Sequence, residues 1–203
     1  MKISPIIPVL AIEDASKVLD IAKALLAGGV NIMEITLRTK AAFEAIEIVS
    51  KKLPEMCVGA GTVVNLEQFK EVKKRGAKFI ISPGLNETLL DYAQDSSIAY
   101  IPGVSSASEI MLAMEYGYFD LKLFPANVVG GVQALKAFGA PFSQVSFCPT
   151  GGVNLDNLRE FTSLDNVACV GGTWFCSKAL IDAGDYEAIT RLSKEAIEVI
   201  DAR

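Results

Sequence analysis

Residues 18–36, VLDIAKALLAGGVNIMEIT, contain one copy of the unit that decides the fold. The first half has apolar side chains at the i, i+3, i+4, i+7 and i+8 spacing of a helix with one buried face, namely Val18, Ile21, Ala22, Leu25 and Leu26. Gly28 and Gly29 follow, where a glycine commonly ends a helix in a left-handed conformation. Residues 31–36 then form a mostly apolar run of strand length. This stretch therefore predicts a helix, a tight turn and a buried strand in succession.

The same unit recurs along the chain. Mostly apolar runs of strand length lie near residues 6–12, 31–36, 57–62, 78–82, 98–102, 118–124, 145–149 and 167–171. Helical patterns separate these runs, and no Pro-rich or Ser-rich linker divides the chain. Alternating strands and helices with nearly continuous apolar strands are typical of a parallel sheet that is covered by helices.

Eight such units predict an α/β fold of the closed-barrel type. A (β/α)8 or TIM barrel takes about 200 residues or more, so residues 1–203 would form one barrel domain with short loops. A doubly wound open sheet is the alternative, but no GxGxxG loop follows the first predicted strand. We therefore expect the barrel.

Short signals at the predicted helix ends agree with this division. Ser106 and Glu109 match the S-x-x-E capping box, and Asn65 with Gln68 resembles a weaker form of it. The one-face helical pattern also recurs near the end of the chain, at Ile189, Leu192, Ala196, Val199 and Ile200.

The composition excludes several classes of function. The net charge is −5, whereas a nucleic-acid footprint needs clustered Lys and Arg. No apolar run approaches the roughly 18 residues of a membrane span, and no charged-then-apolar signal peptide opens the chain. We therefore expect a soluble, cytoplasmic protein that binds neither nucleic acid nor membrane.

The chain contains no histidine, which restricts its chemistry further. Without imidazole there is no Ser-His-Asp or Cys-His nucleophile and no histidine-bound zinc. The cysteines show no CxxC pairing, so we expect neither a disulfide nor a metal site at Cys57, Cys148, Cys169 and Cys176. Any catalysis must use lysine, carboxylates, arginine, hydroxyls and backbone amides.

Lys122 is the most informative single residue. It lies inside the run Phe119-Asp120-Leu121-Lys122-Leu123-Phe124-Pro125, which otherwise has the pattern of a buried strand. Burial disfavours the charged form of an amine, and a neutral amine attacks carbonyl carbons in the first step of Schiff-base catalysis. The alternative is a strand-end lysine whose ammonium group extends to solvent.

Two further charged residues accompany the second strand. Glu34 shares one face of that strand with Ile32 and Thr36, because side chains alternate along a strand. A carboxylate inside a barrel could act as a general acid/base, and the alternative is a structural ion pair with Lys122. Arg38 follows where the strand opens into its loop, where a guanidinium could clamp a carboxylate or phosphate, or could simply be solvated.

Other strand ends carry small and hydroxylated residues, and in a barrel these ends form the active site. Gly59-Ala60-Gly61 precedes Thr62, and such small residues let a ligand approach the backbone closely while Thr62 offers a hydroxyl. Ser82-Pro83-Gly84 is a sharp, rigid turn, and the alternative to a binding role is that it shapes the rim and does nothing else. Paired glycines follow the last two strands, in Pro149-Thr150-Gly151-Gly152 and in Gly171-Gly172-Thr173. Exposed amides of such loops commonly bind phosphate in these barrels, so we expect a phosphate site there.

Six strings distributed in order over nearly the whole chain resemble one family: MEITLRT (33–39), VGAGTV (58–63), ISPGL (81–85), LKLFPA (121–126), CPTGGV (148–153) and VGGTW (170–174). The family is that of the 2-keto-3-deoxy-6-phosphogluconate (KDPG) aldolases, which includes enzymes that also cleave 4-hydroxy-2-oxoglutarate (KHG). The resemblance implies a class I pyruvate aldolase of the Entner–Doudoroff pathway, commonly a homotrimer.

The resemblance also implies roles for individual residues. Lys122 would form the Schiff base with the substrate, and Glu34 would be the general acid/base. Arg38 and Thr62 would bind the pyruvoyl carboxylate, with Pro83 lining the same pocket. The residue that would contact the substrate's sugar hydroxyls is Thr150. The residues that would hold the substrate's phosphate are Gly151, Gly152, Gly172 and Thr173. Family members more often have serine at the position of Thr173, whose extra methyl group could crowd the phosphate.

A class I aldolase requires neither a metal nor an organic cofactor. The expected partner is a phosphorylated ketoacid substrate. Three alternatives stay open: an aldolase for the galactonate-configured substrate, an oxaloacetate decarboxylase using the same imine, and a barrel that binds a phosphorylated metabolite without catalysis. The last is disfavoured because a pure binder has no need of a costly buried amine.

Overall fold

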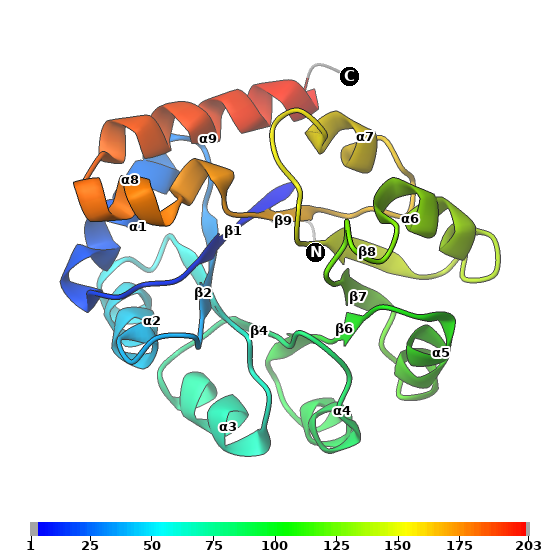
Figure 1. Ribbon diagram of the computed structural model, residues 1–203. Coiled ribbons are helices and arrows are strands. Elements are labelled where there is room, and N and C mark those ends of the chain that lie inside the picture. Colours follow the sequence, from blue (N-terminus) through cyan, green and yellow to red (C-terminus); the bar gives the residue numbers. More distant parts are fainter. Residues whose placement is uncertain (1–3, 202–203) are drawn as a thin grey trace.

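A computed structural model describes residues 4–201 of the chain. Its strands are β1 (Ile6–Leu10), β2 (Ile32–Thr36), β3 (Cys57–Gly61), β4 (Phe79–Ile81), β5 (Ala99–Ile101), β6 (Gly103–Val104), β7 (Asp120–Leu123), β8 (Ser146–Pro149) and β9 (Val170–Gly172). Its α-helices are α1 (Val18–Ala27), α2 (Ala42–Lys52), α3 (Leu66–Lys74), α4 (Glu87–Gln94), α5 (Ala107–Glu115), α6 (Gly131–Gly139), α7 (Leu158–Thr162), α8 (Lys178–Ala183) and α9 (Tyr186–Asp201). Short 3-10 helices lie at η1 (Ala15–Lys17) and η2 (Trp174–Cys176). The strands stand at the centre of the molecule, and the helices surround them (Figure 1).

All strand pairs are parallel, as predicted, but the described strands form two sheets instead of one eight-stranded sheet. One sheet has the order β5-β4-β3-β2-β1-β9, and the other has the order β6-β7-β8. Isolated parallel bridges join Phe147 to Val167 and Thr150 to Gly171, between the ends of the two sheets. The prediction of an α/β fold with a parallel sheet and covering helices is confirmed, whereas a continuous eight-stranded barrel is not clear from the pairing.

The run 98–102, predicted as one strand, is the place where the sheets separate. The structure divides this region into β5 and β6, with Pro102 between them. Proline has no N–H to donate to a neighbouring strand. The carbonyl of Ile101 accepts from the Ser82 amide at 3.3 Å, while the carbonyl of Pro102 accepts from the Lys122 amide at 2.9 Å. The chain therefore turns here from pairing with β4 to pairing with β7.

The helices bury the faces that their sequence patterns predict. In α1 the buried side chains include Val18, Ile21, Ala22 and Leu25, and Leu26 packs partly buried against the same core. Gly29 follows with φ +84°, in the left-handed conformation expected after a helix end. The helix-to-strand unit read from residues 18–36 is thus present in the structure.

The predicted helix caps are present, with one difference in detail. Asn65 Oδ1 accepts a hydrogen bond from the Gln68 amide at 2.9 Å, and Ser106 Oγ accepts from the Glu109 amide at 3.4 Å. In a standard capping box the Glu109 carboxylate would bond to the Ser106 amide. Instead it accepts from the amide of Ser105 at 2.7 Å, one residue earlier.

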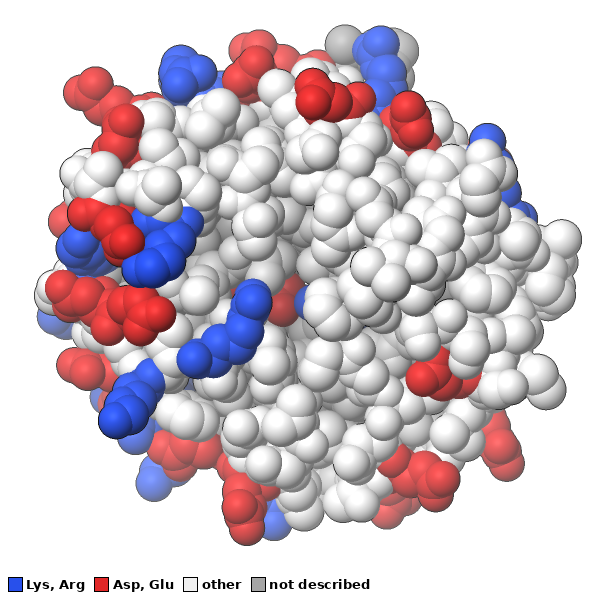
Figure 2. Space-filling model, in the orientation of Figure 1, with Lys and Arg blue, Asp and Glu red and all other residues white. Residues whose placement is uncertain are grey.

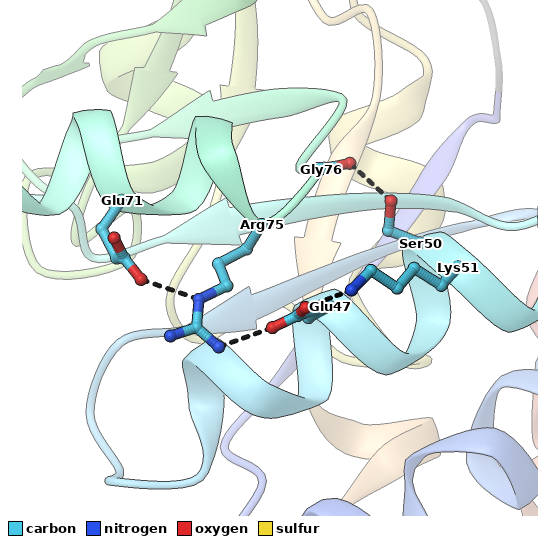
Figure 3. Close-up of polar contacts among 6 residues, drawn as sticks. All are labelled: Glu47, Ser50, Lys51, Glu71, Arg75 and Gly76. Atoms are coloured by element: carbon cyan, nitrogen blue, oxygen red, sulfur yellow. Dashed lines mark hydrogen bonds and ion pairs between the residues drawn. The ribbon is translucent and has the colours of Figure 1, made fainter.

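Helices α2 and α3 are joined by a cluster of charged side chains at the surface (Figure 3). Arg75 donates through Nη1 to Glu47 at 2.6 Å and through Nε to Glu71 at 2.7 Å. Lys51 also forms an ion pair with Glu47, and Ser50 Oγ donates to the Gly76 carbonyl at 3.0 Å. These contacts join the two helices outside the central strands.

Two cavities lie at opposite ends of the strands. A cavity of about 440 Å³ is lined by residues at the starts of several strands, including Ile7, Ile32, Cys57, Phe79 and Asp120. None of the residues predicted for the active site lines it. The predicted residues lie around a second cavity, at the opposite, carboxyl ends of the strands, where α/β barrels place their active sites.

All four cysteines are free thiols, and Cys148, Cys169 and Cys176 are buried. Within residues 4–201, no helix combines the length and the apolar character needed to cross a membrane.

Candidate active site

Every residue predicted for the site lines a single cavity of about 290 Å³ at the carboxyl ends of the strands. The lining comprises Glu34, Arg38, Thr62, Pro83, Lys122, Thr150, Gly151, Gly152, Gly172 and Thr173, together with Val9, Thr36, Phe124, Val153 and Gly171. In the space-filling view this face is hollowed at its centre, with basic and acidic atoms inside the hollow (Figure 2). The volume is at the lower end of the range for small-molecule sites.

The Lys122–Glu34 pair lies at the bottom of the cavity. Lys122 projects from β7 and Glu34 from β2, and Nζ lies 3.2 Å from Glu34 Oε1. The side chains are only 6% and 1% exposed, so neither charge has much contact with water. This burial excludes the alternative in which the Lys122 ammonium extends to solvent. The contact also means that an amine and a carboxylate can exchange a proton directly.

Gly61 makes room for this carboxylate. A Cβ atom added to Gly61 would lie 1.9 Å from Glu34 Oε1, which is far inside van der Waals contact. Sequence reasoning interpreted the small residues before Thr62 as space for a ligand. The structure shows that at Gly61 the space is taken by the Glu34 side chain.

Arg38 is held at the mouth of the cavity by a neighbour on β2. Its Nε donates to Thr36 Oγ1 at 3.1 Å, and Thr36 Oγ1 in turn donates to the Leu10 carbonyl at 2.7 Å. Among the described residues the two terminal nitrogens of Arg38 have no hydrogen-bond partner. Arg38 thus has its inner nitrogen anchored while its outer nitrogens can bind an anion through two parallel bonds.

Thr62 and Pro83 form the adjoining wall. Thr62 is the one described non-glycine residue with a positive φ, at +59°, and such strain is often found at functional sites. The turn that carries Pro83 is fixed by Ser82, whose Oγ donates to the Gly84 carbonyl at 2.7 Å and lies 2.8 Å from the Tyr100 hydroxyl. Because Ser82 has one hydroxyl hydrogen and donates it to Gly84, the Tyr100 hydroxyl is the donor in the second contact. Burial raises the pKa of Tyr100 to about 12.

Thr150 and the two glycine pairs form the opposite wall. Thr150 forms a parallel bridge with Gly171, so the loops after β8 and β9 lie side by side. Gly151 and Gly152 have positive φ angles of +101° and +82°, which only glycine adopts readily. These glycines give the backbone the freedom to turn its amides into the cavity.

A pair of thiols lies directly below this wall. Cys148 is in register with Lys122 on the neighbouring strand, and its Sγ lies 3.9 Å from Thr150 Oγ1. A hydrogen bond from Cys169 lowers the pKa of Cys148, and the same contact raises the pKa of Cys169 well above its usual value. Within residues 4–201, no group of His, Cys, Asp and Glu side chains is arranged to hold a metal ion.

Comparison with known proteins agrees with this geometry. The family model for the KDPG and KHG aldolases matches residues 1–192. The chain belongs to this aldolase family. It is 49% identical to the KHG/KDPG aldolase of Escherichia coli (strain K12) over 96% of this chain and 91% of that one.

Solved structures of the family superpose closely on this chain. One is the KDPG aldolase of Legionella pneumophila, with pyruvate captured at low pH as a covalent carbinolamine; it is 44% identical, has a TM-score of 0.95, and covers 96% of this chain and 95% of that chain. Another is the Zymomonas mobilis ZM4 enzyme with 3-phosphoglycerate, which is 41% identical with a TM-score of 0.90, covering 96% and 91% of the two chains.

Some residues that line this cavity were missed by sequence reasoning. Phe124 lies two positions after Lys122 on the same strand face, and Lys122 Nζ lies 5.4 Å from the centre of its ring. That period-two spacing was a usable signal, as was the shared face of Glu34 and Thr36. Val9 and Val153 carry no such signal, because an apolar residue at a strand end resembles ordinary core.

Proposed function

We propose that the protein is a class I aldolase that cleaves KDPG to pyruvate and glyceraldehyde 3-phosphate, and KHG to pyruvate and glyoxylate. The observation that carries the proposal is the buried Lys122–Glu34 contact of 3.2 Å at the bottom of a cavity. It is supported by family membership and by the Legionella pneumophila relative, which captures pyruvate covalently as a carbinolamine. The enzyme is a lyase that acts on a phosphorylated ketoacid.

The first step uses the proton exchange that the contact allows. Transfer of a proton from Lys122 to Glu34 leaves a neutral amine, which attacks the C2 carbonyl carbon of the substrate. Protonation of the resulting carbinolamine hydroxyl by Glu34 releases water and leaves a protonated imine. The imine carbon draws electrons from the C3–C4 bond.

The second step breaks that bond. Glu34, directly or through one water, takes the proton of the C4 hydroxyl as the C3–C4 electron pair moves toward the imine. The aldehyde leaves, and an enamine of pyruvate remains on Lys122. Protonation of its C3 carbon and addition of water then release pyruvate and regenerate the free amine.

The two walls of the cavity hold the two ends of the substrate. Arg38 and Thr62, beside Pro83, bind the ketoacid carboxylate, because the outer nitrogens of Arg38 are available for two parallel hydrogen bonds. Thr150 contacts the hydroxyl groups of the chain, and the phosphate binds at Gly151, Gly152, Gly172 and Thr173. The substrate's reacting carbons are then held over Lys122, which lowers the entropic part of the barrier.

We also propose that the two sheets belong to one closed (β/α)8 barrel, with residues 1–203 as one domain. Support comes from the hydrogen bond from the Lys122 amide to the Pro102 carbonyl and from the bridge between Thr150 and Gly171, at the two places where the sheets meet. A crystal structure with continuous backbone pairing at both places would support closure, and a gap at either would refute it.

A homotrimer is the proposed assembly, as the family resemblance implies. Between residues 123 and 155 the only charged residue is Lys136, and Val128 in this segment is 82% exposed. This segment includes α6, and the corresponding side of the molecule is almost free of charged side chains in the space-filling view (Figure 2). Depletion of charge is characteristic of contact surfaces. Light scattering after gel filtration should give three times the chain mass, and a monomer would contradict the trimer.

A coupled assay tests the proposed function. Purified protein is mixed with KDPG, and pyruvate is measured through lactate dehydrogenase and NADH; cleavage is the expected result. The galactonate-configured substrate, KHG and oxaloacetate are compared in parallel. Thr150 favours the gluconate configuration, because a hydroxyl at that wall can distinguish the orientation of the substrate hydroxyls. If none of the four substrates yields pyruvate, the remaining alternative is a protein that binds a phosphorylated metabolite without catalysis.

A further inference from the structure

The loop after β8 is tied to the loop after β7 through three successive carbonyl groups. The Thr150 carbonyl accepts from the Ala126 amide at 2.8 Å, and the Gly151 carbonyl accepts from the Asn127 amide at 3.1 Å. The Gly152 carbonyl accepts from the side-chain amide of Asn127, Nδ2, at 2.8 Å. The third contact is made by a side chain and therefore depends on residue identity.

The loop after β8 contains Gly151 and Gly152 and is called the glycine loop. The three contacts fix the direction of its backbone amides. In a trans peptide the N–H group points away from the carbonyl of the same peptide plane. Because the carbonyls of Gly151 and Gly152 face Asn127, the N–H groups of Gly152 and Val153 face the other way. Both residues line the cavity, and neither amide donates to another described residue. Two unpartnered amides are thus available to an anion.

Asn127 also fits closely against the glycine that it holds. A Cβ atom added to Gly152 would lie 2.3 Å from Asn127 Nδ2, so the contact requires glycine at that position. Asn157, just before α7, donates through Nδ2 to the same carbonyl at 2.9 Å. Asn127 and Asn157 come from different segments of the chain, and Asn127 follows β7, the strand that carries Lys122. It therefore connects the strand of the reacting amine to the glycine loop.

We propose that Asn127 is a positioning residue for the phosphate of the substrate. By holding the Gly152 carbonyl it keeps the amides of Gly152 and Val153 directed at the phosphate, without touching the substrate itself. This inference rests on the proposed function, and it deepens the assignment of the phosphate site. The affinity for ligands that carry a phosphate should therefore depend on Asn127, and the affinity for ligands that lack one should not.

Steady-state kinetics with the two substrates test this selectivity. KDPG carries a phosphate and KHG does not, so each serves as the reference for the other. Loss of one exposed hydrogen bond in Asn127→Ala should raise KM for KDPG about 2- to 10-fold. The KM for KHG and both kcat values should stay unchanged. Asn127→Asp should raise KM for KDPG further, since a carboxylate cannot donate and would repel both the carbonyl and the phosphate.

Asn166→Ala is the matched control. Asn166 Nδ2 donates to the Leu135 carbonyl at 2.9 Å, which is the same kind of contact at a place outside the cavity. Its loss should leave the KM values for both substrates unchanged. Equal rises for KDPG and KHG in Asn127→Ala, or no rise for either, would overturn the proposal.

Calorimetry keeps this test separate from the proposed function, because it needs no turnover. The probes are 3-phosphoglycerate, the compound in the Zymomonas mobilis structure, and pyruvate, which lacks a phosphate. Asn127→Ala should weaken 3-phosphoglycerate binding about 2- to 10-fold and leave pyruvate binding unchanged. If the wild-type protein binds 3-phosphoglycerate but does not cleave KDPG, the aldolase proposal fails while this result still decides the role of Asn127. Unchanged 3-phosphoglycerate binding in Asn127→Ala, or none in the wild type, overturns the role.

Discussion

Two lysine–glutamate ion pairs in this molecule have the same chemical groups and differ in burial. The Lys122–Glu34 pair lies between β7 and β2, with side chains 6% and 1% exposed. The Lys51–Glu47 pair lies on α2, with side chains 69% and 30% exposed, and Glu47 also binds Arg75 (Figure 3). The difference in exposure determines what each pair can do.

At the surface, water and dissolved ions screen the attraction between the two charges, so the pair contributes little energy. The buried pair has little contact with water, and its amine nitrogen lies 3.2 Å from a carboxylate oxygen, within reach of direct proton transfer. An amine that can become neutral beside a proton acceptor can react with a carbonyl group. The surface pair thus belongs to a charged cluster on α2, whereas the buried pair can perform chemistry.

The largest expected effect comes from removing each lysine in turn. Lys122→Ala should abolish aldol cleavage, because no other group at the bottom of the cavity can form an imine. Lys51→Ala should leave kcat and KM unchanged. Because removal of one partner leaves Glu34 buried and unpaired, Lys122→Arg is made as well; it keeps the positive charge but not the nucleophile. Wild-type rates in either Lys122 variant, shown by circular dichroism to be folded, would contradict the mechanism.

The next largest effect on kcat is expected when the glutamate of each pair is replaced in turn by glutamine. Glu34→Gln should lower kcat by roughly 10²–10⁴-fold, the usual contribution of general acid/base catalysis. Measurement of kcat for KDPG in both variants is sufficient, with Glu47→Gln as the control that should retain full activity. A loss below about tenfold in Glu34→Gln would make Glu34 an orienting residue instead.

Arg38→Ala extends the comparison to a third charged group, at the cavity mouth. The loss of two charge-assisted hydrogen bonds should weaken pyruvate binding about 10- to 100-fold, as measured by calorimetry. Arg75→Ala is the matched control, since Arg75 also forms two such bonds, but to surface carboxylates. Unchanged pyruvate affinity in Arg38→Ala would refute the carboxylate clamp.

The smallest expected effect is on the thermal stability of the protein and comes from Glu47 of the surface pair. Contacts with Lys51 and Arg75 lower the pKa of Glu47, so folded Glu47 releases its proton at a lower pH than unfolded Glu47 does. The resulting stabilisation is present above the unfolded pKa and is lost as the pH falls through the lowered one. Glu47→Gln should therefore lower Tm at neutral pH by about 2 °C or less. The difference should disappear in strongly acidic solution; a difference that grows there would contradict the assignment.

Much of the fold could be predicted because the periodicities that carry it are local. The one-face pattern from Val18 to Leu26 and the glycines after it are properties of a short segment, and the structure reproduces both. The break at Pro102 was missed, although proline inside a predicted strand was a warning. Pairing between the ends of the two sheets could not be predicted from the sequence, because it depends on strand twist and register over the whole chain.

The site was predictable where a residue contradicts its surroundings. Lys122 and Glu34 interrupt apolar strands, and the structure brings them into contact across 88 residues of sequence. Asn127 interrupts no apolar pattern, because polar residues are ordinary in a surface loop. Its contact with Gly152 spans 25 residues, and only the folded chain reveals it. Sequence reasoning found the groups proposed to react, and the structure added those that hold them in place.

Borohydride reduction in the presence of pyruvate tests the central claim most directly. Reduction converts an imine into a stable amine, and peptide mass spectrometry then locates the pyruvate-derived adduct. We expect the adduct on the peptide that contains Lys122, none on the peptide that contains Lys51, and none on any peptide of Lys122→Ala. An adduct on another lysine, or no adduct on the folded wild-type protein, would contradict the account of Lys122 as the reacting amine.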